Sequence, residues 1–299
     1  MENELIQKFI QHVLLKNTGS SFTENDYRCD LKIFENYLNS EGCSSYLNVD
    51  KELAELFIVY LREEKKLSVT TIRRIVSCMR CFYQYLSENE LIGINPFKKI
   101  KSARNAKKLP NIISYDDVCY LLDSVDTSTK LGLRNKALFE LMYSTGMRLI
   151  EIENLKINDI NFNDQSIVVV GKGNKERIVF FNDSTKMALE DYLKVRSSWA
   201  TDIDSLWLNK NGNILSRRGI EKILNDHCKK IGFNKKVHPH LLRHCFASHM
   251  LDAGADIKTI QCLLGHSNLE STQIYTHVSI RTMQRCFENN HLRKKEESK

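Results

Sequence analysis

The sequence predicts a mainly α-helical protein of two domains, with a small antiparallel β-sheet in the second domain. Three observations lead to this fold class. Apolar residues recur every three or four positions through most of residues 1–90, which is the period of a helix. The helical pattern then breaks, and a segment rich in lysine with few apolar residues runs from Pro96 to Pro110 within a linker at 91–110. Between Asp159 and Phe181 the period falls to two, which is typical of strands.

Length and composition restrict the class of protein. The 299 residues are enough for two domains with separate cores, and 42% hydrophobic and 27% charged residues are ordinary for a soluble protein. No apolar run approaches the roughly 20 residues of a membrane span, and the N-terminus lacks the basic start of a signal peptide. The nine cysteines are scattered through apolar helical patterns, which indicates a reducing compartment. We expect a cytoplasmic protein that does not bind membranes.

Four helices are expected in the first domain, residues 1–90. Apolar periodicity places them near residues 5–14, 23–38, 53–61 and 70–86. The last helix has an apolar stripe and a polar stripe, and the polar stripe includes Arg73, Ser77 and Arg80. These side chains can reach phosphates and base edges, so they are candidate DNA-binding residues. A solvent-exposed basic face explains the stripe equally well.

Charge is distributed unevenly along this part of the chain. Residues 1–64 hold 6 basic and 12 acidic side chains, whereas residues 65–108 hold 11 basic and 2 acidic ones. A solvated charge run is the usual explanation, but a change of this size also fits a surface that follows a phosphate backbone. Residues 91–110 are therefore interpreted as a basic linker that becomes ordered on DNA. Its candidate DNA-binding residues are Lys98, Lys99, Lys101 and Arg104.

The second domain is expected at residues 111–290, with a polar C-terminal tail at 291–299. Ser114 lies three residues before Asp117, which fits a capping box at the start of a helix. A further helical run ends at a glycine two residues before Arg148. Arg148 is therefore expected at a junction between two helices.

The sheet of this domain is expected to consist of three short strands between residues 159 and 181. The last two strands are joined by Gly-Lys-Gly-Asn-Lys, a hairpin turn with Lys172 at its tip. A lysine in such a turn is normally only solvated. On the rim of a nucleic-acid cleft, the same turn would hold the lysine against a phosphate.

Four groups suited to binding or attacking a phosphate lie between positions 240 and 275. His240 and Arg243 are three residues apart, so a helix would project them from one face. His266 follows a glycine that ends a helical pattern, and Tyr275 comes nine residues later. Each residue alone is commonly structural, but the combination indicates phosphate chemistry.

A phosphate clamp would draw on both ends of this domain. Arg148 and Arg243 each carry a planar guanidinium that donates aligned hydrogen bonds and stays charged at any working pH. They suit a phosphate that gains negative charge, and His266 can donate a further bond to a non-bridging oxygen. The arginines supply the positive charge, and the sequence has neither a carboxylate cluster nor a nucleotide-binding loop. We therefore expect no metal and no cofactor.

Tyr275 is the candidate nucleophile, beside scattered Ser, Thr and Cys residues. A phenol has an unperturbed pKa of about 10, so its attack on a phosphodiester needs a base or a positive field. His240 is placed to take the phenolic proton. The departing sugar oxygen needs a proton in turn, and Lys172 is the candidate acid.

Five sequence boxes resemble those of the tyrosine recombinases, also called the phage integrase family. They are Thr-Gly-Met-Arg-Leu-Ile-Glu at 145–151, Gly-Lys-Gly-Asn-Lys-Glu-Arg at 171–177, His-Leu-Leu-Arg-His at 240–244, Leu-Gly-His at 264–266 and Tyr-Thr-His at 275–277. The boxes occur in the family's order, and the helical N-terminal region is similar to the family's core-binding domain. Ile150 and Cys245 depart from the usual pattern, but neither replaces a chemical group.

The resemblance implies an active enzyme that cuts and rejoins DNA through a covalent 3′-phosphotyrosyl intermediate and a Holliday junction. It implies a two-domain architecture that forms a C-shaped clamp on DNA. The catalytic residues that it implies are Arg148, Lys172, His240, Arg243, His266 and Tyr275. They agree with the residues chosen above on chemical grounds.

The resemblance also implies partners. These are double-stranded DNA at a specific recombination site, a tetramer of identical copies or of two related recombinases, and a DNA translocase as regulator. The C-terminal helix of each protomer is expected to dock on its neighbour through Met283, Cys286 and Phe287. Within the family the chain is most similar to Xer-type recombinases, which convert chromosome or plasmid dimers to monomers before cell division. The alternatives are a phage- or transposon-type integrase, a type IB topoisomerase-like relaxing enzyme, and an inactive DNA-binding architectural protein.

Overall fold

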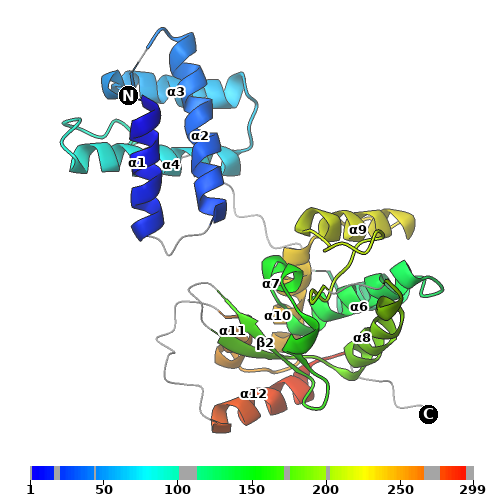
Figure 1. Cartoon of the computed structure of the whole chain (residues 1–299). Coiled ribbons are helices and arrows are strands. Elements are labelled where there is room, and N and C mark those ends of the chain that lie inside the picture. Colours follow the sequence, from blue (N-terminus) through cyan, green and yellow to red (C-terminus); the bar gives the residue numbers. More distant parts are fainter. Residues whose placement is uncertain are drawn as a thin grey trace. The chain divides into compact units, whose positions relative to one another are not determined.

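The computed structural model describes residues 2–16, 21–43, 45–100, 113–171, 176–199, 203–265 and 277–293. The chain divides into two compact units, Met1–Leu109 and Pro110–Lys299. Both units are built mainly from helices, and the described part of the second also contains a small antiparallel sheet (Figure 1). This confirms the predicted fold class. None of the described helices is long and apolar enough to span a membrane.

The described part of the first unit contains four α-helices and a short 3-10 helix. They are α1 (Glu2–Lys16), α2 (Ser21–Ser40), η1 (Tyr46–Asn48), α3 (Lys51–Glu63) and α4 (Val69–Glu88). Among the α-helices, α3 and α4 each begin at a capping side chain. Asp50 accepts a hydrogen bond from the backbone N–H of Leu53, and Ser68 accepts one from that of Thr71.

Aromatic rings fill the core of the first unit. Each of the four helices contributes a fully buried phenylalanine, and the segment after α4 contributes a fifth; they are Phe9, Phe34, Phe57, Phe82 and Phe97. The rings of Phe34 and Phe57 meet edge to face with centroids 4.6 Å apart, and those of Phe34 and Phe97 meet in the same way at 5.6 Å. The segment after α4 is thus part of this core.

The first ten residues of the predicted linker, 91–100, therefore belong to the first unit. Arg80 on α4 donates to the carbonyl of Phe97 at 3.2 Å and also to that of Ile100, which is itself buried. Asn95 closes the turn, since its side chain accepts from the N–H of Phe97 and donates to the carbonyl of Arg80. Two of its ten residues are lysines, Lys98 and Lys99, and the buried side chains of Phe97 and Ile100 anchor the segment to the core.

The second unit begins with Ser114, whose side chain accepts from the N–H of Asp117 and caps the first helix. Its elements are α5 (Tyr115–Asp123), α6 (Lys130–Thr145), α7 (Leu149–Glu153), η2 (Ile157–Asp159), β1 (Ile160–Asn161), β2 (Ser166–Val170), β3 (Glu176–Phe180), α8 (Asp183–Arg196), η3 (Ser197–Trp199), α9 (Arg217–Lys230), α10 (Pro239–Asp252), α11 (Ile257–Leu264) and α12 (His277–Asn290). The antiparallel strands lie in the order β1-β2-β3, with Ser166 opposite Phe180.

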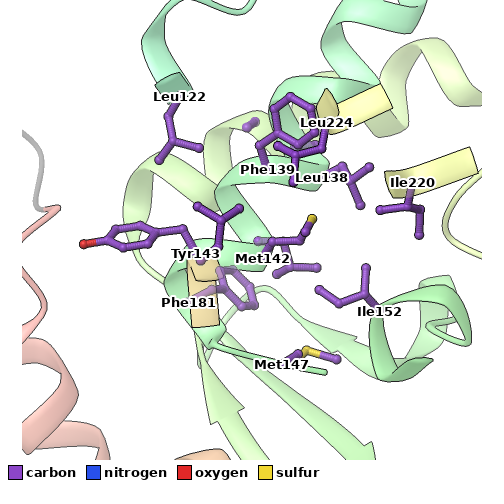
Figure 2. Packing of buried hydrophobic residues seen from close by; sticks show 14 of the residues in the cluster. Leu122, Leu138, Phe139, Met142, Tyr143, Met147, Ile152, Phe181, Ile220 and Leu224 are labelled. Carbon is purple, nitrogen blue, oxygen red and sulfur yellow. The ribbon is translucent and has the colours of Figure 1, made fainter. Parts of the chain in front are cut away.

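Helix α6 forms the centre of the second unit. Its residues are buried without a break from Ala137 to Thr145, and it packs against α8 and α10. Figure 2 shows this core, in which the labelled α6 residues lie among side chains from α5, α7, α9 and the end of β3; the labelled residues are Leu122, Leu138, Phe139, Met142, Tyr143, Met147, Ile152, Phe181, Ile220 and Leu224. The core fixes α7 and α10, which position two of the predicted phosphate-binding arginines.

Helix α12 packs on its own unit. Met283 and Phe287 are buried in a second apolar cluster that includes Phe180 of β3 and Phe246 of α10. Cys286 is half-buried against the same cluster. The resemblance predicted that these α12 side chains dock on a neighbouring protomer. In this structure they cover an apolar surface of the same chain, which β3, α10 and α11 present to α12; docking on a neighbouring protomer stays a prediction.

The start of the predicted polar tail is buried as well. The guanidinium of Arg293 forms ion pairs with Glu140, which is fully buried on α6, at 2.5 Å, and with Asp123 at 2.6 Å. The carbonyl of Arg293 accepts a hydrogen bond from Asn182. The sequence predicted a polar tail from residue 291. Arg293 is buried nevertheless, because two carboxylates pair with its charge.

Candidate phosphate-binding site

Arg148 is the residue at which α7 begins. Its backbone N–H donates to Oε2 of Glu151 at 2.7 Å, and its Nη1 donates to Oε1 of the same carboxylate at 3.0 Å. Two residues earlier, Gly146 has a φ of +57°, and a Cβ there would lie 2.5 Å from the ring of Phe246. The turn that places Arg148 therefore requires a glycine, both for its left-handed backbone and for the close approach.

Arg243 lies in the second turn of α10 and is only 9% exposed. Its Nη1 donates to the carbonyl of Gly146 and its Nη2 to that of Leu264, each at 2.6 Å. Burial lowers the pKa of Arg243 to about 10, and the positive charges of Arg148 and Arg177 act in the same direction. The group is still protonated at neutral pH, so it offers a fixed positive charge.

Among the described side chains, three arginines donate hydrogen bonds to the C-terminal end of α11. Three successive carbonyls each accept a hydrogen bond from one of them. The N···O distances are 2.9 Å for Arg177 to Leu263, 2.6 Å for Arg243 to Leu264 and 2.8 Å for Arg148 to Gly265. The last carbonyls of a helix lack partners within the helix and carry partial negative charge, which favours cations there. His266, a predicted catalytic residue, follows Gly265 in the sequence.

Glu151 and Arg177 form a buried ion pair within this cluster. Nη1 and Nη2 of Arg177 lie 2.8 Å from Oε1 and Oε2 of Glu151, and the two side chains are 4% and 3% exposed. Burial raises the pKa of the Glu151 carboxyl, but hydrogen bonds and charge from Arg177, joined by Arg148, lower it below its ordinary value. The carboxylate is therefore ionised and shared between two arginines.

His240 is exposed in the first turn of α10. That helix begins at Pro239, and Nδ1 of His238 accepts from the N–H of Leu241 at 3.1 Å, so the neighbouring histidine serves as a helix cap. The helical period places His240 and Arg243 on one face of α10. The site thus combines a solvent-accessible imidazole with a buried guanidinium.

Three predicted catalytic residues lie outside the described part of the chain, namely Lys172, His266 and Tyr275. Strands β2 and β3 flank the segment that contains Lys172, and Gly265, with a φ of +68°, ends α11 directly before His266. Among the described residues, no three His, Cys, Asp or Glu side chains lie close enough together to hold a metal ion.

The candidate DNA-binding residues of the first unit fall into four groups. Exposed side chains belong to Ser77, Lys98 and Lys99. Arg73 is half-buried on α4. Arg80 is also half-buried, and its guanidinium binds the two carbonyls after α4 and so supports the fold of the unit; its role in DNA binding stays a prediction. Lys101 and Arg104 lie outside the described residues.

Sequence reasoning missed Glu151 and Arg177, although each ends one of the five boxes. A signal was available for Arg177. Strand β3 alternates, and its period of two places Arg177 on the same face as Val179, which is buried. A charge on a buried face requires a partner of opposite sign, and Glu151 carries that charge on another element.

Comparison with protein families identifies both units. Residues 111–281 match the phage integrase family, and residues 6–90 match the N-terminal SAM-like domain of phage integrases. The tyrosine recombinase XerC of Oceanobacillus iheyensis is 37% identical over 293 residues, with 96% of each chain covered. The tyrosine recombinase XerD of Listeria monocytogenes serotype 4b is 36% identical over 284 residues, which cover 93% of this chain and 95% of the relative.

Solved structures agree with this assignment. The crystal structure of XerA recombinase is 30% identical, with a TM-score of 0.51 over 95% of this chain and 98% of the other. The XerH recombinase bound to its palindromic difH substrate, a post-cleavage complex, has a TM-score of 0.71 at 24% identity over 94% of this chain and 82% of the other, which shows a shared fold. This chain belongs to the phage integrase family of tyrosine recombinases.

Proposed function

We propose that this protein is a site-specific recombinase that cuts and rejoins DNA and converts chromosome or plasmid dimers to monomers at cell division, in the cytoplasm. The observation that carries the proposal is the convergence of Arg148 and Arg243 on the last carbonyls of α11, directly before His266. The similarity to XerC and XerD over nearly the whole chain favours dimer resolution over the role of a phage or transposon integrase.

The charges of this cluster suit a phosphodiester in its transition state. Arg148, Arg177 and Arg243 together with Glu151 carry a net charge of +2. A guanidinium has five N–H donors. The described side-chain contacts use two hydrogen bonds from each of Arg148 and Arg243. The remaining donors are available for the non-bridging oxygens, which gain negative charge as the phosphorus is attacked.

The proposed reaction proceeds in two transesterifications. Tyr275 attacks the phosphorus while His240 takes the phenolic proton, and a 3′-phosphotyrosyl bond forms. The bond to the 5′ oxygen breaks, and Lys172 gives that oxygen a proton. His266 donates a hydrogen bond to a non-bridging oxygen. A 5′-hydroxyl of the partner strand then reverses these steps, so the phosphotyrosyl ester conserves the bond energy and no nucleotide or metal is required.

Strand exchange between two duplexes requires four active sites, so the proposal includes a tetramer on DNA. The protomers are four identical copies or two pairs with a related recombinase, and a DNA translocase is the proposed regulator. The first unit, with Lys98 and Lys99 exposed, is proposed to hold the duplex and to complete a C-shaped clamp.

The chemical test uses a library of nicked duplexes, because a nick lets the cleaved fragment escape and traps the enzyme on DNA. The wild-type protein should form a covalent adduct, and sequencing the trapped DNA should return one recognition site. Tyr275→Phe should bind the same site and form no adduct. An undiminished adduct in this variant would refute the nucleophile. Efficient relaxation of a supercoiled plasmid without the site would instead indicate a topoisomerase.

The cellular role needs its own test. Cells that lack the gene should accumulate chromosome or plasmid dimers, and the wild-type gene should restore monomers where the Tyr275→Phe gene does not. A protein that forms adducts in vitro, but whose loss leaves dimer levels unchanged, would be an integrase of a mobile element and not a dimer resolvase.

A further inference from the structure

We propose that Arg177 is a positioning residue of the phosphate site, which keeps Glu151 from neutralising Arg148 and fixes the end of α11. The inference rests on the proposed function, because it assigns a role within the same site. Arg177 would not touch the DNA itself. Its side chain is 4% exposed, and its described partners are all groups of the protein.

The first part of this role is competition for one carboxylate. Glu151 contacts both arginines through Oε1, with Nη1 of Arg177 at 2.8 Å and Nη1 of Arg148 at 3.0 Å. Arg177 binds the Glu151 carboxylate more strongly than Arg148 does, because its guanidinium contacts both oxygens in a bidentate geometry. Without Arg177, the charge of the buried Glu151 carboxylate would be balanced by the half-exposed Arg148 alone.

The net charge of the site follows from this pairing. The charges of Arg148 and Glu151 alone sum to zero. Arg177 adds a positive charge, so the three groups together carry a net charge of +1 beside a phosphate bound by Arg148. Arg243 has no carboxylate among its described hydrogen-bond partners, which are the carbonyls of Gly146 and Leu264. Loss of Arg177 would thus lower the charge of the whole cluster from +2 to +1.

The second part of the role concerns the end of α11. Nε of Arg177 donates to the carbonyl of Leu263 at 2.9 Å, so one side chain joins β3, Glu151 and α11. A Cβ built on Gly265 would lie 2.9 Å from Cδ of Arg177, which shows that the arginine stem lies directly against this glycine. Arg177 therefore supports the turn from which the chain continues to His266.

The test combines charge removal with charge restoration. Arg177→Gln should lower the rate of adduct formation by about 100-fold, the size of effect expected when one stabilising donor is lost. Its affinity for the DNA site should change by less than about threefold, because the clamp acts on transition-state charge. The double variant Glu151→Gln, Arg177→Gln removes both charges, returns the cluster to +2 and should regain about tenfold of the lost rate. A merely structural role would make the double variant worse than the single one.

A matched control separates charge from stability. Arg196 on α8 is 6% exposed in the same unit and binds the carbonyls of Ile203, Ser205 and Leu206. Arg196→Gln should lower the melting temperature and leave the adduct rate per folded molecule unchanged. If Arg177→Gln proves too unstable to purify, Arg177→Lys carries the test, since it keeps the charge but loses bidentate binding. Its adduct rate should fall by about tenfold, because the charge of +2 is kept while the bonds to the Leu263 carbonyl and to one oxygen of Glu151 are lost. A wild-type rate, or a loss of about 100-fold despite the retained charge, would overturn the inference.

A second readout does not depend on recombination. Inorganic phosphate should raise the melting temperature of the wild type above its value in chloride at equal ionic strength. Arg177→Gln should lose most of this rise, and Arg196→Gln should keep it. If Arg177→Gln keeps both the rise and the wild-type adduct rate, the inference is wrong. If the wild type shows the rise but never forms an adduct, the proposed function fails while the role of Arg177 at an anion site stands.

Discussion

Arg243 donates a hydrogen bond at 2.6 Å to the carbonyl of Gly146, which lies two residues before Arg148. This contact joins α10 to the turn between α6 and α7, so the two proposed phosphate-binding arginines are held in one arrangement. Their relative position is set by the protein before any DNA binds. Preorganised charge of this kind stabilises a transition state without a reorganisation cost.

Replacing Arg243 by lysine tests this arrangement. A lysine keeps one positive charge, but a single ammonium cannot bind the carbonyls of Gly146 and Leu264 in the planar geometry of a guanidinium and also face a phosphate. We expect the adduct rate of Arg243→Lys to fall by about 100-fold, with little change in affinity for DNA. Single-turnover cleavage and gel-shift titration measure the two quantities. A loss confined to affinity would contradict the role.

The pH dependence of the unfolding free energy should show that the Glu151 carboxyl is ionised in the folded protein. Its folded pKa lies below the ordinary value of 4.5, so the stability that it contributes is fully present above pH 4.5. This contribution is lost as the pH falls through the lower folded pKa. The difference in unfolding free energy between the wild type and Glu151→Gln should therefore shrink below pH 4.5. Urea denaturation over a pH series measures it, and a constant difference would argue against an ionised Glu151.

Arg80 should matter for the fold of the first unit more than for DNA. Arg80→Ala removes the donor from the carbonyls of Phe97 and Ile100, which should cost about 1–3 kcal/mol of local stability. Amide hydrogen exchange in the full-length protein should show faster exchange in α4 and the segment after it. Ser77→Ala, an exposed change on the same helix, serves as the control. Weaker DNA binding with unchanged exchange would support a direct contact of Arg80 with DNA.

The buried Arg293 should stabilise the second unit. Arg293→Met leaves Glu140, which is fully buried, with Lys136 as its remaining cationic partner at 3.0 Å. We expect a loss of about 3 kcal/mol in unfolding free energy, the lower end for a broken buried pair, because Lys136 still compensates part of the charge. Arg285→Met, an exposed change on α12, should change stability by less than about 0.5 kcal/mol. Equal losses in the two variants would contradict the buried pair.

Local patterns predicted the elements of this fold well. Helices and strands are encoded in the spacing of neighbouring residues, and Ser114 marked the start of α5 by its distance to Asp117. The boundary at residue 91 was less accurate, because Phe97 and Ile100 are too few to form a period. Their burial depends on Arg80 and on the core that α1, α2, α3 and α4 form together. A local sequence pattern does not contain this information.

Site residues could be predicted from the sequence where the side chain alone suits the chemistry of a phosphate. Arg148 and Arg243 were found because guanidinium groups suit phosphates and because their boxes are specific. The ion pair of Glu151 and Arg177 joins residues 26 positions apart, and that of Arg293 and Glu140 joins residues 153 apart. Such partners are chosen by the three-dimensional packing, so a single sequence shows the charges but not their pairing.

The end of α11 gives this site a property that no single arginine has. Three guanidinium groups donate to three consecutive carbonyls at the end of one short helix, so a displacement of α11 would break one hydrogen bond of each in the same event. Because α12 packs on α11, the C-terminal helix contacts the element that joins the three arginines, far along the chain from Arg148.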